Sequence, residues 1–337
     1  MVRAGTRRSI VAKAILLSKH DGAPRAEVRE LSAQEFPPAE VRLRVEYSSL
    51  NYKDALAIVK GEPIVRQWPM VPGIDGVGVV EESSHPDLKA GQRVVLNGWG
   101  VGERHWGCLA QYAGAKADWL VPLPASLDAR DAMALGTAGY TAMLCVLKLE
   151  KHGVKPSDGE VLVTGAAGGV GSIATTLLAR RGFSVVASTG RTGEAPYLEK
   201  LGASRVIDRK ELSERGKPLE KEKWAAVVDS VGSNTLANAC ASTRYGGVVA
   251  ACGLAQGMDL AMTVAPFILR SVTLAGVDSV IAPLAVRRTA WQYLADEIDR
   301  ELLRVISHEV GLQEAIAVAP KLLAGEVRGR TVVDVNA

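Results

Sequence analysis

The sequence contains few cysteines, and they are far apart. None of the four, Cys108, Cys145, Cys240 and Cys252, forms a Cys-x-x-Cys pair with another. Zinc knuckles and disulfide frameworks need closely and regularly spaced cysteines, so this spacing argues against both. We therefore expect most of these thiols to be reduced and buried among apolar side chains.

An excess of charge of one sign is also missing. The 40 basic and 37 acidic residues leave a formal net charge of +3, too small and too dispersed to predict a nucleic-acid or membrane partner. No apolar run approaches the roughly 20 residues of a transmembrane helix. The start of the chain has Arg3, Arg7 and Arg8 but no following apolar segment, which predicts a short disordered basic tail rather than a signal peptide. We expect a cytoplasmic protein.

What the sequence does contain is typical of a soluble protein with more than one domain. It has 337 residues, of which 47% are hydrophobic and 23% are charged, and this predicts about two domains. The first third consists of short β-like runs separated by proline and glycine, at residues 11–17, 41–45, 76–80 and 93–96. These runs predict a compact, mostly antiparallel β domain, followed by a helix over about residues 128–149.

From residue 160 the pattern changes to strands that alternate with helices. Strands are predicted at residues 161–164, 184–188, 205–207, 225–229, 248–252 and 272–276, and helices at 171–181, 196–201 and 236–242. This alternation predicts a parallel, doubly wound α/β sheet with right-handed crossovers. A further helix is expected at about 283–303, and β character returns at 330–335.

A glycine-rich turn is the most informative motif. Residues 164–171 read Thr-Gly-Ala-Ala-Gly-Gly-Val-Gly, after the apolar run 160–163 and before a helix-like stretch. Strand, glycine turn and helix together favour a dinucleotide pyrophosphate at the helix N-terminus. Gly168 would let the backbone approach the pyrophosphate, and Gly171 would let helix and strand pack closely. Ala166 replaces the usual first glycine, so a tight turn without a ligand remains an alternative.

The end of the second strand of this fold carries a second signal. NAD sites usually have an acidic residue there, whereas this sequence has Thr189, Gly190 and Arg191 and no carboxylate before Glu194. A guanidinium suits a ribose 2′-phosphate, because it offers forked, charge-assisted hydrogen bonds. These residues predict NADPH as the cofactor, and a solvated arginine in a turn is the alternative.

These motifs belong to a wider set of matching stretches. The longest are Ser-Ser-Leu-Asn-Tyr-Lys-Asp-Ala-Leu at 48–56, Pro-Met-Val-Pro-Gly-Ile-Asp at 69–75, Asn-Gly-Trp-Gly-Val-Gly-Glu at 97–103 and Gly-Thr-Ala-Gly-Tyr-Thr-Ala-Met-Leu at 136–144, and shorter ones lie at 245–247, 251–254, 266–270 and 276–280. In them the chain resembles the medium-chain dehydrogenase/reductase superfamily, its zinc-free, quinone-oxidoreductase-like branch, and within that branch the acryloyl-CoA reductase group. The resemblance extends over residues 14–335.

The resemblance implies a division into domains and a type of site. A GroES-like β-rich catalytic domain would comprise residues 10–135 and 305–337, and a Rossmann nucleotide-binding domain residues 136–304, with the active site in the cleft between them. Zinc-dependent relatives carry a cysteine where this chain has residues 51–54 and Gly-His-Glu where it has Gly-Ile-Asp at 73–75. We therefore predict no metal. The resemblance also implies a homodimer joined by strands of the nucleotide domain, near residues 272–276.

The activity implied is the NADPH-dependent reduction of the carbon–carbon double bond of acryloyl-CoA, which gives propionyl-CoA. The catalytic candidates are Tyr52, as a donor to the enolate oxygen or as proton source, and Asn51 and Asp54, as orienting groups. Tyr52 could instead be a packed residue with its hydroxyl on the backbone, and Lys53 and Asp54 could form a structural ion pair. A quinone or enone oxidoreductase and a non-catalytic NADPH-binding redox sensor are the competing functions.

The remaining site residues are carried over from the resembled family or taken from composition. The residues expected to bind the cofactor are Tyr52, Ala167, Gly168, Gly169, Val170, Gly171, Thr189, Gly190, Arg191, Arg209, Leu254, Ile268 and Ser279. For Leu254 and Ile268 taken alone, core packing is the default interpretation. The family's polar contact near the C-terminus falls on Gly325 here. The substrate candidates are Trp99, His105 and Trp106 in a glycine-rich loop, and Arg66, Arg287 and Arg288 for the CoA phosphates.

Overall fold

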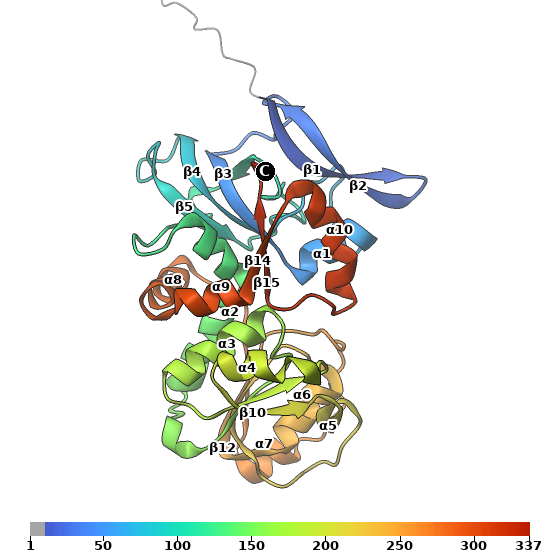
Figure 1. Ribbon diagram of the computed structural model, residues 1–337, viewed down its shortest axis with the longest axis vertical. Coiled ribbons are helices and arrows are strands. Elements are labelled where there is room, and N and C mark those ends of the chain that lie inside the picture. Colours follow the sequence, from blue (N-terminus) through green and yellow to red (C-terminus); the bar gives the residue numbers. More distant parts are fainter. Residues whose placement is uncertain (1–10) are drawn as a thin grey trace, which may run out of the picture. The chain divides into compact units, whose positions relative to one another are not determined.

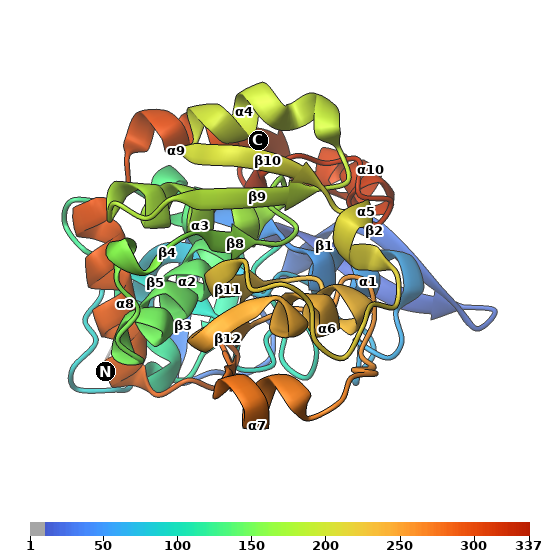
Figure 2. The same cartoon turned by 90° about the horizontal axis from the view of Figure 1, so that it is seen from below.

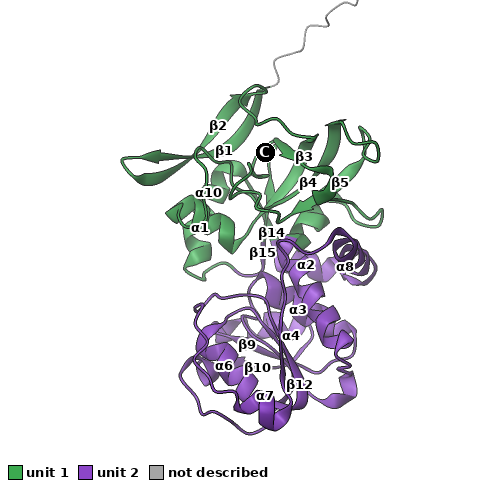
Figure 3. Cartoon of the chain, turned by 180° about the vertical axis from the view of Figure 1, so that it is seen from behind, with its two compact units in different colours: residues 1–136, 308–327, 331–337 green, residues 137–307, 328–330 purple. Residues whose placement is uncertain are grey.

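The computed structural model describes residues 11–337, so the basic tail predicted at the start of the chain lies outside the described part. The chain forms two compact units (Figure 3). Unit 1 comprises residues up to 136 together with 308–327 and 331–337, and unit 2 comprises residues 137–307 and 328–330. The sequence had placed these two main boundaries at 135/136 and 304/305.

Unit 1 is built on a seven-stranded sheet in the order β14-β15-β3-β4-β5-β7, with β6 paired to β3. The strands are β3 (Val41–Leu50), β4 (Asp75–Ser83), β5 (Arg93–Asn97), β6 (Tyr112–Ala115), β7 (Leu120–Pro122), β14 (Ser307–Gly311) and β15 (Arg330–Asp334). The neighbours β15/β3, β3/β4, β3/β6, β4/β5 and β5/β7 are antiparallel, as predicted. Along β3, Val41, Leu43 and Val45 are buried and Arg44 is exposed, so one face of the strand packs into the core.

A separate hairpin and two helices complete unit 1 (Figure 1). β1 (Val11–His20) and β2 (Ala23–Ser32) pair in register around a two-residue turn, in which Asp21 and Gly22 both have positive φ. An Asp-Gly turn of this kind matches the twist of a hairpin. The helices α1 (Tyr52–Lys60) and α10 (Leu312–Leu323) were not predicted, and neither was the short 3₁₀ helix η1 (Ala117–Trp119).

Unit 2 contains a six-stranded parallel sheet in the order β10-β9-β8-β11-β12-β13 (Figure 2). The strands are β8 (Val161–Val163), β9 (Val185–Thr189), β10 (Ala203–Asp208), β11 (Trp224–Asp229), β12 (Thr243–Ala251) and β13 (Thr273–Gly276). Every residue of β8, β9 and β11 is buried, as expected for strands that helices cover on both faces. The α/β fold class and the doubly wound sheet were predicted correctly.

The helices of unit 2 follow its strands in the predicted alternation. They are α3 (Gly169–Arg180), α4 (Ala195–Lys200), α5 (Lys210–Ser213), α6 (Ser233–Ala241), α7 (Ala265–Arg270), α8 (Leu284–Glu297) and α9 (Arg300–Ile306), with the 3₁₀ helices η2 (Pro156–Asp158) and η3 (Thr192–Glu194). The helix predicted over 283–303 is in fact two. The second begins because the Asp299 carboxylate accepts hydrogen bonds from the backbone N–H groups of Glu301 and Leu302 at 2.9 and 3.2 Å.

The long apolar helix α2 (Ala129–Lys151) differs from expectation in one respect. It is long and apolar enough to pass as a membrane span, although no such run was predicted, and 83% of its most apolar window is buried inside the protein. Gly136 interrupts it with the non-helical angles φ 50° and ψ −154°. α2 is therefore two core helical segments that meet where the chain passes from unit 1 to unit 2.

Candidate active site

The strand order of unit 2 reverses beside the glycine turn. From β8 the chain moves outward through β9 and β10, and then returns to β11 on the other side of β8. Such a switch point, at the carboxyl ends of parallel strands, is where open α/β sheets bind their ligands. The predicted residues lie at or just after the ends of β8, β9, β10, β12 and β13, and so share this edge: Ala167–Gly171, Thr189–Arg191, Arg209, Leu254 and Ser279.

The turn and α3 are packed too closely to accept a side chain at Gly171. A Cβ there would collide with the carbonyl oxygen of Gly165 and with Cα of Ala166, and both are backbone atoms that cannot move aside. Gly168 is the N-cap residue of α3, so the first N–H groups of this helix, which lack intrahelical partners, follow it directly. The geometry fits an anion at the start of α3, as a pyrophosphate requires.

The Ala167 carbonyl ties this turn to two other segments. It accepts hydrogen bonds from Arg191 Nη2 and from the backbone N–H of Gly329, each at 3.0 Å. The backbone N–H of Ala166 in turn donates to the Ser188 carbonyl of β9 at 3.0 Å. The turn is thus held both by the end of β9 and by the 328–330 segment of unit 2.

Two guanidinium groups flank the end of β9. The backbone N–H of Arg191 donates to Thr189 Oγ1 at 3.1 Å, while its Nη1 is buried and makes no hydrogen bond within residues 11–337. Arg209 lies against Gly190, where an added Cβ would be 2.5 Å from its Nε. A buried donor without a partner costs free energy, so Nη1 is placed for a ligand acceptor. The solvated-arginine alternative does not describe Arg191, and the residues fit the 2′-phosphate of NADPH.

Arg330 is a residue of this edge that the sequence analysis missed. It is only 4% exposed, and a Cβ on Gly169 would lie 2.9 Å from its Cδ and 3.4 Å from its Nη1. A cation beside the positive end of a helix is unfavourable by itself, and it becomes favourable when an anion binds between the two. No motif marks this arginine, because its approach to the turn depends on the return of the chain about 160 residues later.

A second missed contact lies next to it. The Arg328 guanidinium stands 4.5 Å above the Tyr197 ring and pairs with Glu194 at 3.0 Å. Tyr197 donates to Ser172 Oγ of α3 at 2.8 Å. Burial raises the pKa of the Tyr197 phenol, so it stays a donor to Ser172 near neutral pH. These contacts fix the outer side of α3 near its start.

The apolar candidates of unit 2 are exposed. Leu254 is 55% and Ile268 72% exposed, so the core-packing interpretation was wrong for both. Ser279 follows β13, and its carbonyl accepts a hydrogen bond from Arg287 at 3.1 Å.

In unit 1, the predicted catalytic motif lies at the start of α1. Asn51 is 8% exposed and precedes the helix, and Tyr52 is its first residue and is 44% exposed. The Tyr52 hydroxyl makes no hydrogen bond to any residue of the described chain, so it is not held on the backbone. Asp54 is 1% exposed and accepts hydrogen bonds from the backbone N–H groups of Asn51, Gly73 and Ile74 at 2.9, 3.1 and 2.9 Å.

The ionisation of Asp54 is shifted, and its expected ion pair is absent. Burial is the main cause that raises the pKa of Asp54 to about 6, and repulsion by Asp75 adds to it. The predicted Lys53–Asp54 pair is wrong, because Lys53 pairs with Glu103 at 2.6 Å instead. Lys53 follows Tyr52 on α1 and Glu103 lies on the loop of residues 98–107, so this ion pair joins helix and loop.

The aromatic side chains of that loop separate into two groups. The Trp99 ring stacks on Trp119 with ring centroids 6.4 Å apart, and His105 lies 4.9 Å from the same ring. Burial and the nearby cations Lys116 and Arg104 lower the pKa of His105. Trp106 belongs elsewhere, because its Nε1 donates to the Pro69 carbonyl at 3.0 Å. Trp99 and His105 therefore lie together, and Trp106 does not join them.

The three arginines predicted to contact the substrate differ in their exposure. Arg287 is 1% exposed, and it donates to the carbonyls of Ala282, Ser279 and Val280 at 2.8, 3.1 and 2.7 Å. Its prediction as a contact of CoA phosphates is therefore corrected, since a side chain with these contacts braces the start of α8. Arg66 in unit 1 and Arg288 in unit 2 are exposed.

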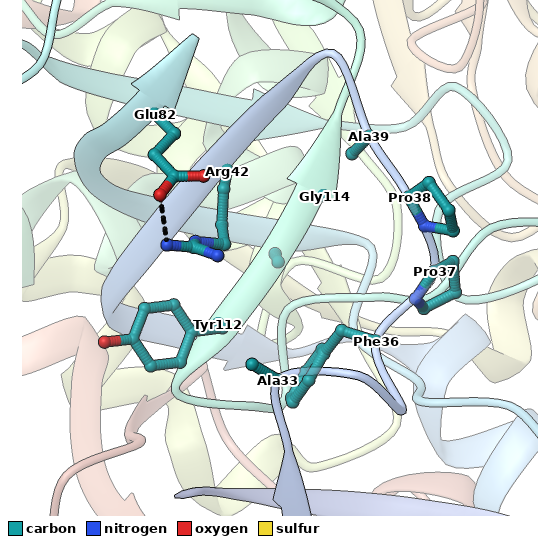
Figure 4. Close-up of a pocket in the computed structure, with 10 residues that line it drawn as sticks. Ala33, Phe36, Pro37, Pro38, Ala39, Arg42, Glu82, Tyr112 and Gly114 are labelled. Carbon is teal, nitrogen blue, oxygen red and sulfur yellow. Dashed lines mark ion pairs between the residues drawn. The ribbon is translucent and has the colours of Figure 1, made fainter. Parts of the chain in front are cut away.

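Unit 1 also contains a pocket that a different set of residues lines (Figure 4). Its volume is about 240 Å³, and it is lined by Ala33, Phe36, Pro37, Pro38, Ala39, Arg42, Glu82, Tyr112, Ala113 and Gly114. Arg42 pairs with Glu82 at 2.9 Å inside it. None of the predicted site residues lines this pocket.

The described residues contain no arrangement of three or more His, Cys, Asp or Glu side chains able to hold a metal ion. Residues 51–54 and 73–75, where zinc-dependent relatives have ligands, instead hydrogen-bond to one another through Asp54.

Comparison with known families agrees with this architecture. The alcohol dehydrogenase GroES-like domain matches residues 37–125, and the zinc-binding dehydrogenase family matches residues 169–299. The chain belongs to the medium-chain dehydrogenase/reductase superfamily, as its sequence predicted.

Individual relatives are similar over nearly the whole chain. The probable acrylyl-CoA reductase AcuI of Escherichia coli is 51% identical and covers 96% of this chain and 100% of its own length. Acrylyl-CoA reductase AcuI of Ruegeria pomeroyi is 50% identical, with 95% and 97% covered. The putative quinone oxidoreductase YhfP of Bacillus subtilis is 41% identical, with 96% and 99% covered. The crystal structure of E. coli YhdH with bound NADPH superimposes with a TM-score of 0.94 at 51% identity, with 96% and 100% covered.

Proposed function

We propose that the protein reduces the carbon–carbon double bond of acryloyl-CoA to propionyl-CoA with NADPH. The observation that carries this proposal is the similarity, at 50% identity over 95% of the chain, to an acrylyl-CoA reductase. The edge of the unit 2 sheet supports the choice of cofactor, because Arg191 offers a buried donor where a 2′-phosphate needs one.

The proposed cofactor contacts follow the strand ends of unit 2. Ala167, Gly168, Gly169 and Val170 line the pyrophosphate, with Gly171 keeping α3 close, and Arg330 adds a charge at the same helix end. Thr189, Gly190, Arg191 and Arg209 hold the 2′-phosphate and the adenosine end. Leu254, Ile268 and Ser279 flank the nicotinamide half, where exposed apolar side chains suit a planar ring.

When bound, NADPH supplies a hydride to the β-carbon of the enoyl thioester. Negative charge then develops on the thioester oxygen as an enolate, and the α-carbon takes up a proton from solvent. Tyr52 donates a hydrogen bond from its phenol to that oxygen, and the exposure of this residue leaves it available for the contact. Asn51 and Asp54 fix the first turn of α1 and so orient Tyr52.

The substrate side uses residues with accessible groups. Trp99 and His105 form a wall of aromatic rings in unit 1, and Arg66 and Arg288 are the arginines proposed for the CoA phosphates. A homodimer that pairs β13 with its counterpart fits the exposed edge of the sheet. The cytoplasm, where NADPH and CoA thioesters are produced and used, is the proposed location.

A quinone or enone reductase is the second candidate, favoured by the 41% identity to a putative quinone oxidoreductase. It would use the same cofactor edge and differ only in the acceptor. A redox sensor that binds NADPH without turnover would leave the accessible Tyr52 without a role.

One assay distinguishes these functions. Purified protein is mixed with NADPH or NADH and with acryloyl-CoA, crotonyl-CoA or a small quinone, and oxidation of the cofactor is followed by absorbance. We expect rapid oxidation of NADPH with acryloyl-CoA, and propionyl-CoA as the product by mass spectrometry. Fast turnover of the quinone without turnover of acryloyl-CoA would exclude the proposal.

A further inference from the structure

The buried carboxylate of Asp75, which is not among the predicted catalytic residues, lies where four segments of unit 1 meet. Asp75 is the first residue of β4 and is 0% exposed. Its Oδ2 accepts hydrogen bonds from Ser49 Oγ at 2.7 Å and from Asn51 Nδ2 at 2.8 Å, and its Oδ1 accepts one from Asn97 Nδ2 at 2.7 Å. One side chain thus joins the ends of β3 and β5 and the residue before α1 to the start of β4.

The Asn51 amide links Asp75 to the second buried carboxylate, Asp54. Asn51 Nδ2 donates to Asp54 Oδ2 at 3.2 Å as well as to Asp75, and the backbone N–H of Asn51 donates to the same oxygen of Asp54 at 2.9 Å. Ser49, Asn51 and Asn97 are 0%, 8% and 2% exposed, so the network is buried. Two carboxylates that share one amide group in such a place repel each other.

The chain segments that follow Asn51 and Asn97 of this network contain residues of the proposed site. Tyr52 directly follows Asn51, and the loop that contains Trp99 directly follows Asn97. Trp99 has φ 58°, in the left-handed region that bulky residues avoid. Such a conformation persists only where its surroundings hold it. The hydrogen bond from Asn97 to Asp75 holds the residue two positions before Trp99 in place.

We propose that Asp75 is a positioning residue for the reduction, because its hydrogen bonds to Asn51 and Asn97 hold Tyr52 and the Trp99 loop in place. Its negative charge also makes Asp54 take up a proton more readily. The proposal rests on the proposed function. Protonation turns an acceptor oxygen of Asp54 into a donor that faces the two N–H donors of Asn51. The hydrogen bonds that orient the first turn of α1 then rearrange, and the reaction slows at low pH.

The groups around Asp54 set the direction of this effect. Repulsion by Asp75 raises the pKa of Asp54, and both carboxylates add to the burial that raises the pKa of the Cys108 thiol, which therefore stays neutral. Lys53 on the same helix is paired with Glu103. The other elements packed against α1 are β2 and α10, and their charged residues are Arg25, Glu27, Arg29, Glu30, Glu314 and Lys321.

The test compares Asp75→Asn with the wild type across pH. We expect kcat for acryloyl-CoA to fall about tenfold or more, as small misplacements in a site do, with the Kd of NADPH unchanged within about twofold by fluorescence titration. Because the repulsion is lost, the fall of kcat at low pH shifts to lower pH. Asp131→Asn, which alters another buried carboxylate of unit 1, is the matched control and leaves the pH profile in place.

A compensating variant separates positioning from general loss of structure. The double variant Asp75→Asn/Asn97→Asp exchanges amide and carboxylate between the two positions, which restores a donor–acceptor pair, and we expect it to recover most of the lost kcat. If Asp75→Asn does not fold, Ser49→Ala removes one donor to the same oxygen. It should lower kcat several-fold with an unchanged Kd for NADPH, and an unchanged kcat would overturn the proposal.

A measurement without turnover keeps this proposal distinct from the proposed function. The carboxyl carbon of Asp54 is titrated by NMR in the wild type and in Asp75→Asn, and its signal is assigned by its loss in Asp54→Asn. We expect the midpoint to move to lower pH in Asp75→Asn. An unmoved midpoint, or an unchanged kcat and pH profile, overturns the proposal. If the wild type does not reduce acryloyl-CoA, the proposed function fails while the titration still tests the link between the two carboxylates.

Discussion

The Arg191 guanidinium has two donors with different roles: one is hydrogen-bonded within the protein, and the other is not. Nη2 holds the Ala167 carbonyl of the glycine turn, and Nη1 is a buried donor without a partner in residues 11–337. The first contact serves any dinucleotide that binds the turn, whereas the second serves only a cofactor with an acceptor beside β9. Coenzyme preference can therefore be measured separately from dinucleotide affinity.

Replacement of Arg191 by alanine should weaken NADPH binding more than NADH binding. Hydrogen bonds to charged groups contribute about 1.5–3 kcal/mol, so we expect the Kd of NADPH to rise about 10- to 100-fold. Kd values from fluorescence titration check this, with Arg205→Ala as control, since Arg205 is paired with Glu160 at 2.9 Å on the same sheet. An equal change for both cofactors would contradict a phosphate role.

Asp54 should make the stability of the protein depend on pH in an unusual direction. Its pKa is raised from 3.8 to about 6, mainly by burial, so the folded state binds the proton more tightly than the unfolded state does. The stabilisation from that proton is full below pH 3.8 and is lost as the pH rises through about 6. We expect the free energy of unfolding of the wild type, relative to Asp54→Asn, to fall from pH 4 to pH 7. A urea titration at each pH measures it, and a rise over that interval would show that the pKa is not raised.

Single residues also show where sequence reasoning failed. The glycine turn and Thr189–Arg191 could be located because each acts through local backbone and neighbouring side chains. The partner of Lys53 is 50 residues away and Arg330 reaches the turn from the far end of the chain, so spacing could not reveal either contact. Arg287 was misjudged because an arginine on a helix is usually exposed, and no residue pattern shows that the preceding loop turns three carbonyls toward it.

Among the secondary-structure elements, α3 and the end of β8 are in close backbone contact at the cofactor edge. Gly171 lies on α3, and its Cα faces Gly165 and Ala166 with no room for another atom. β8 is buried in the middle of the sheet, so α3 is the element that moves when a side chain is added at Gly171.

The variant Gly171→Ala should therefore push α3 away from the turn. Overpacking of this kind costs about 1–3 kcal/mol, and we expect a lower Tm together with a weaker affinity for NADPH, because the helix N-terminus moves. Thermal unfolding and cofactor titration measure the two effects. Gly193→Ala is the control, since nothing lies within 4 Å of a Cβ there. Equal Tm values for the two variants would contradict the close packing.

Elements with a strong local signal were predicted, and those made by tertiary contacts were missed. The buried apolar strands β8, β9 and β11 and the glycine-led α3 appear where the sequence placed them. α1 was not predicted because it has only nine residues and its start depends on Asp54, whose partners at Gly73 and Ile74 come from another segment. The division of the 283–303 segment could have been found, because Asp299 is a good N-cap residue.

Across the whole molecule, one edge of the unit 2 sheet pairs with no further strand of the described chain. β13 is the last strand and pairs only with β12. Exposed apolar side chains occur before it and on α7, at Met258, Val264 and Leu269, which are 85%, 63% and 62% exposed. An open strand edge beside such side chains favours association with another chain.

We expect this edge to join two copies of the protein. Leu269→Asp should then convert a dimer into a monomer, because a desolvated carboxylate without a partner is costly in an apolar interface. Size-exclusion chromatography with light scattering gives the mass in solution. Val11→Asp, at a site 55% exposed in unit 1, is the control and should leave the mass unchanged. A monomeric wild type would contradict the expectation.

The segment around Gly329 has a consequence for how the protein is made. Residues 328–330 complete the support of the glycine turn, and β15, which follows, lies inside the sheet of unit 1 between β14 and β3. During synthesis on the ribosome, both units therefore remain unfinished until this segment has emerged. A nascent chain stalled before residue 328 would lack β15 in the unit 1 sheet and the Gly329 hydrogen bond to the glycine turn. Each unit therefore needs this segment before its own contacts are complete.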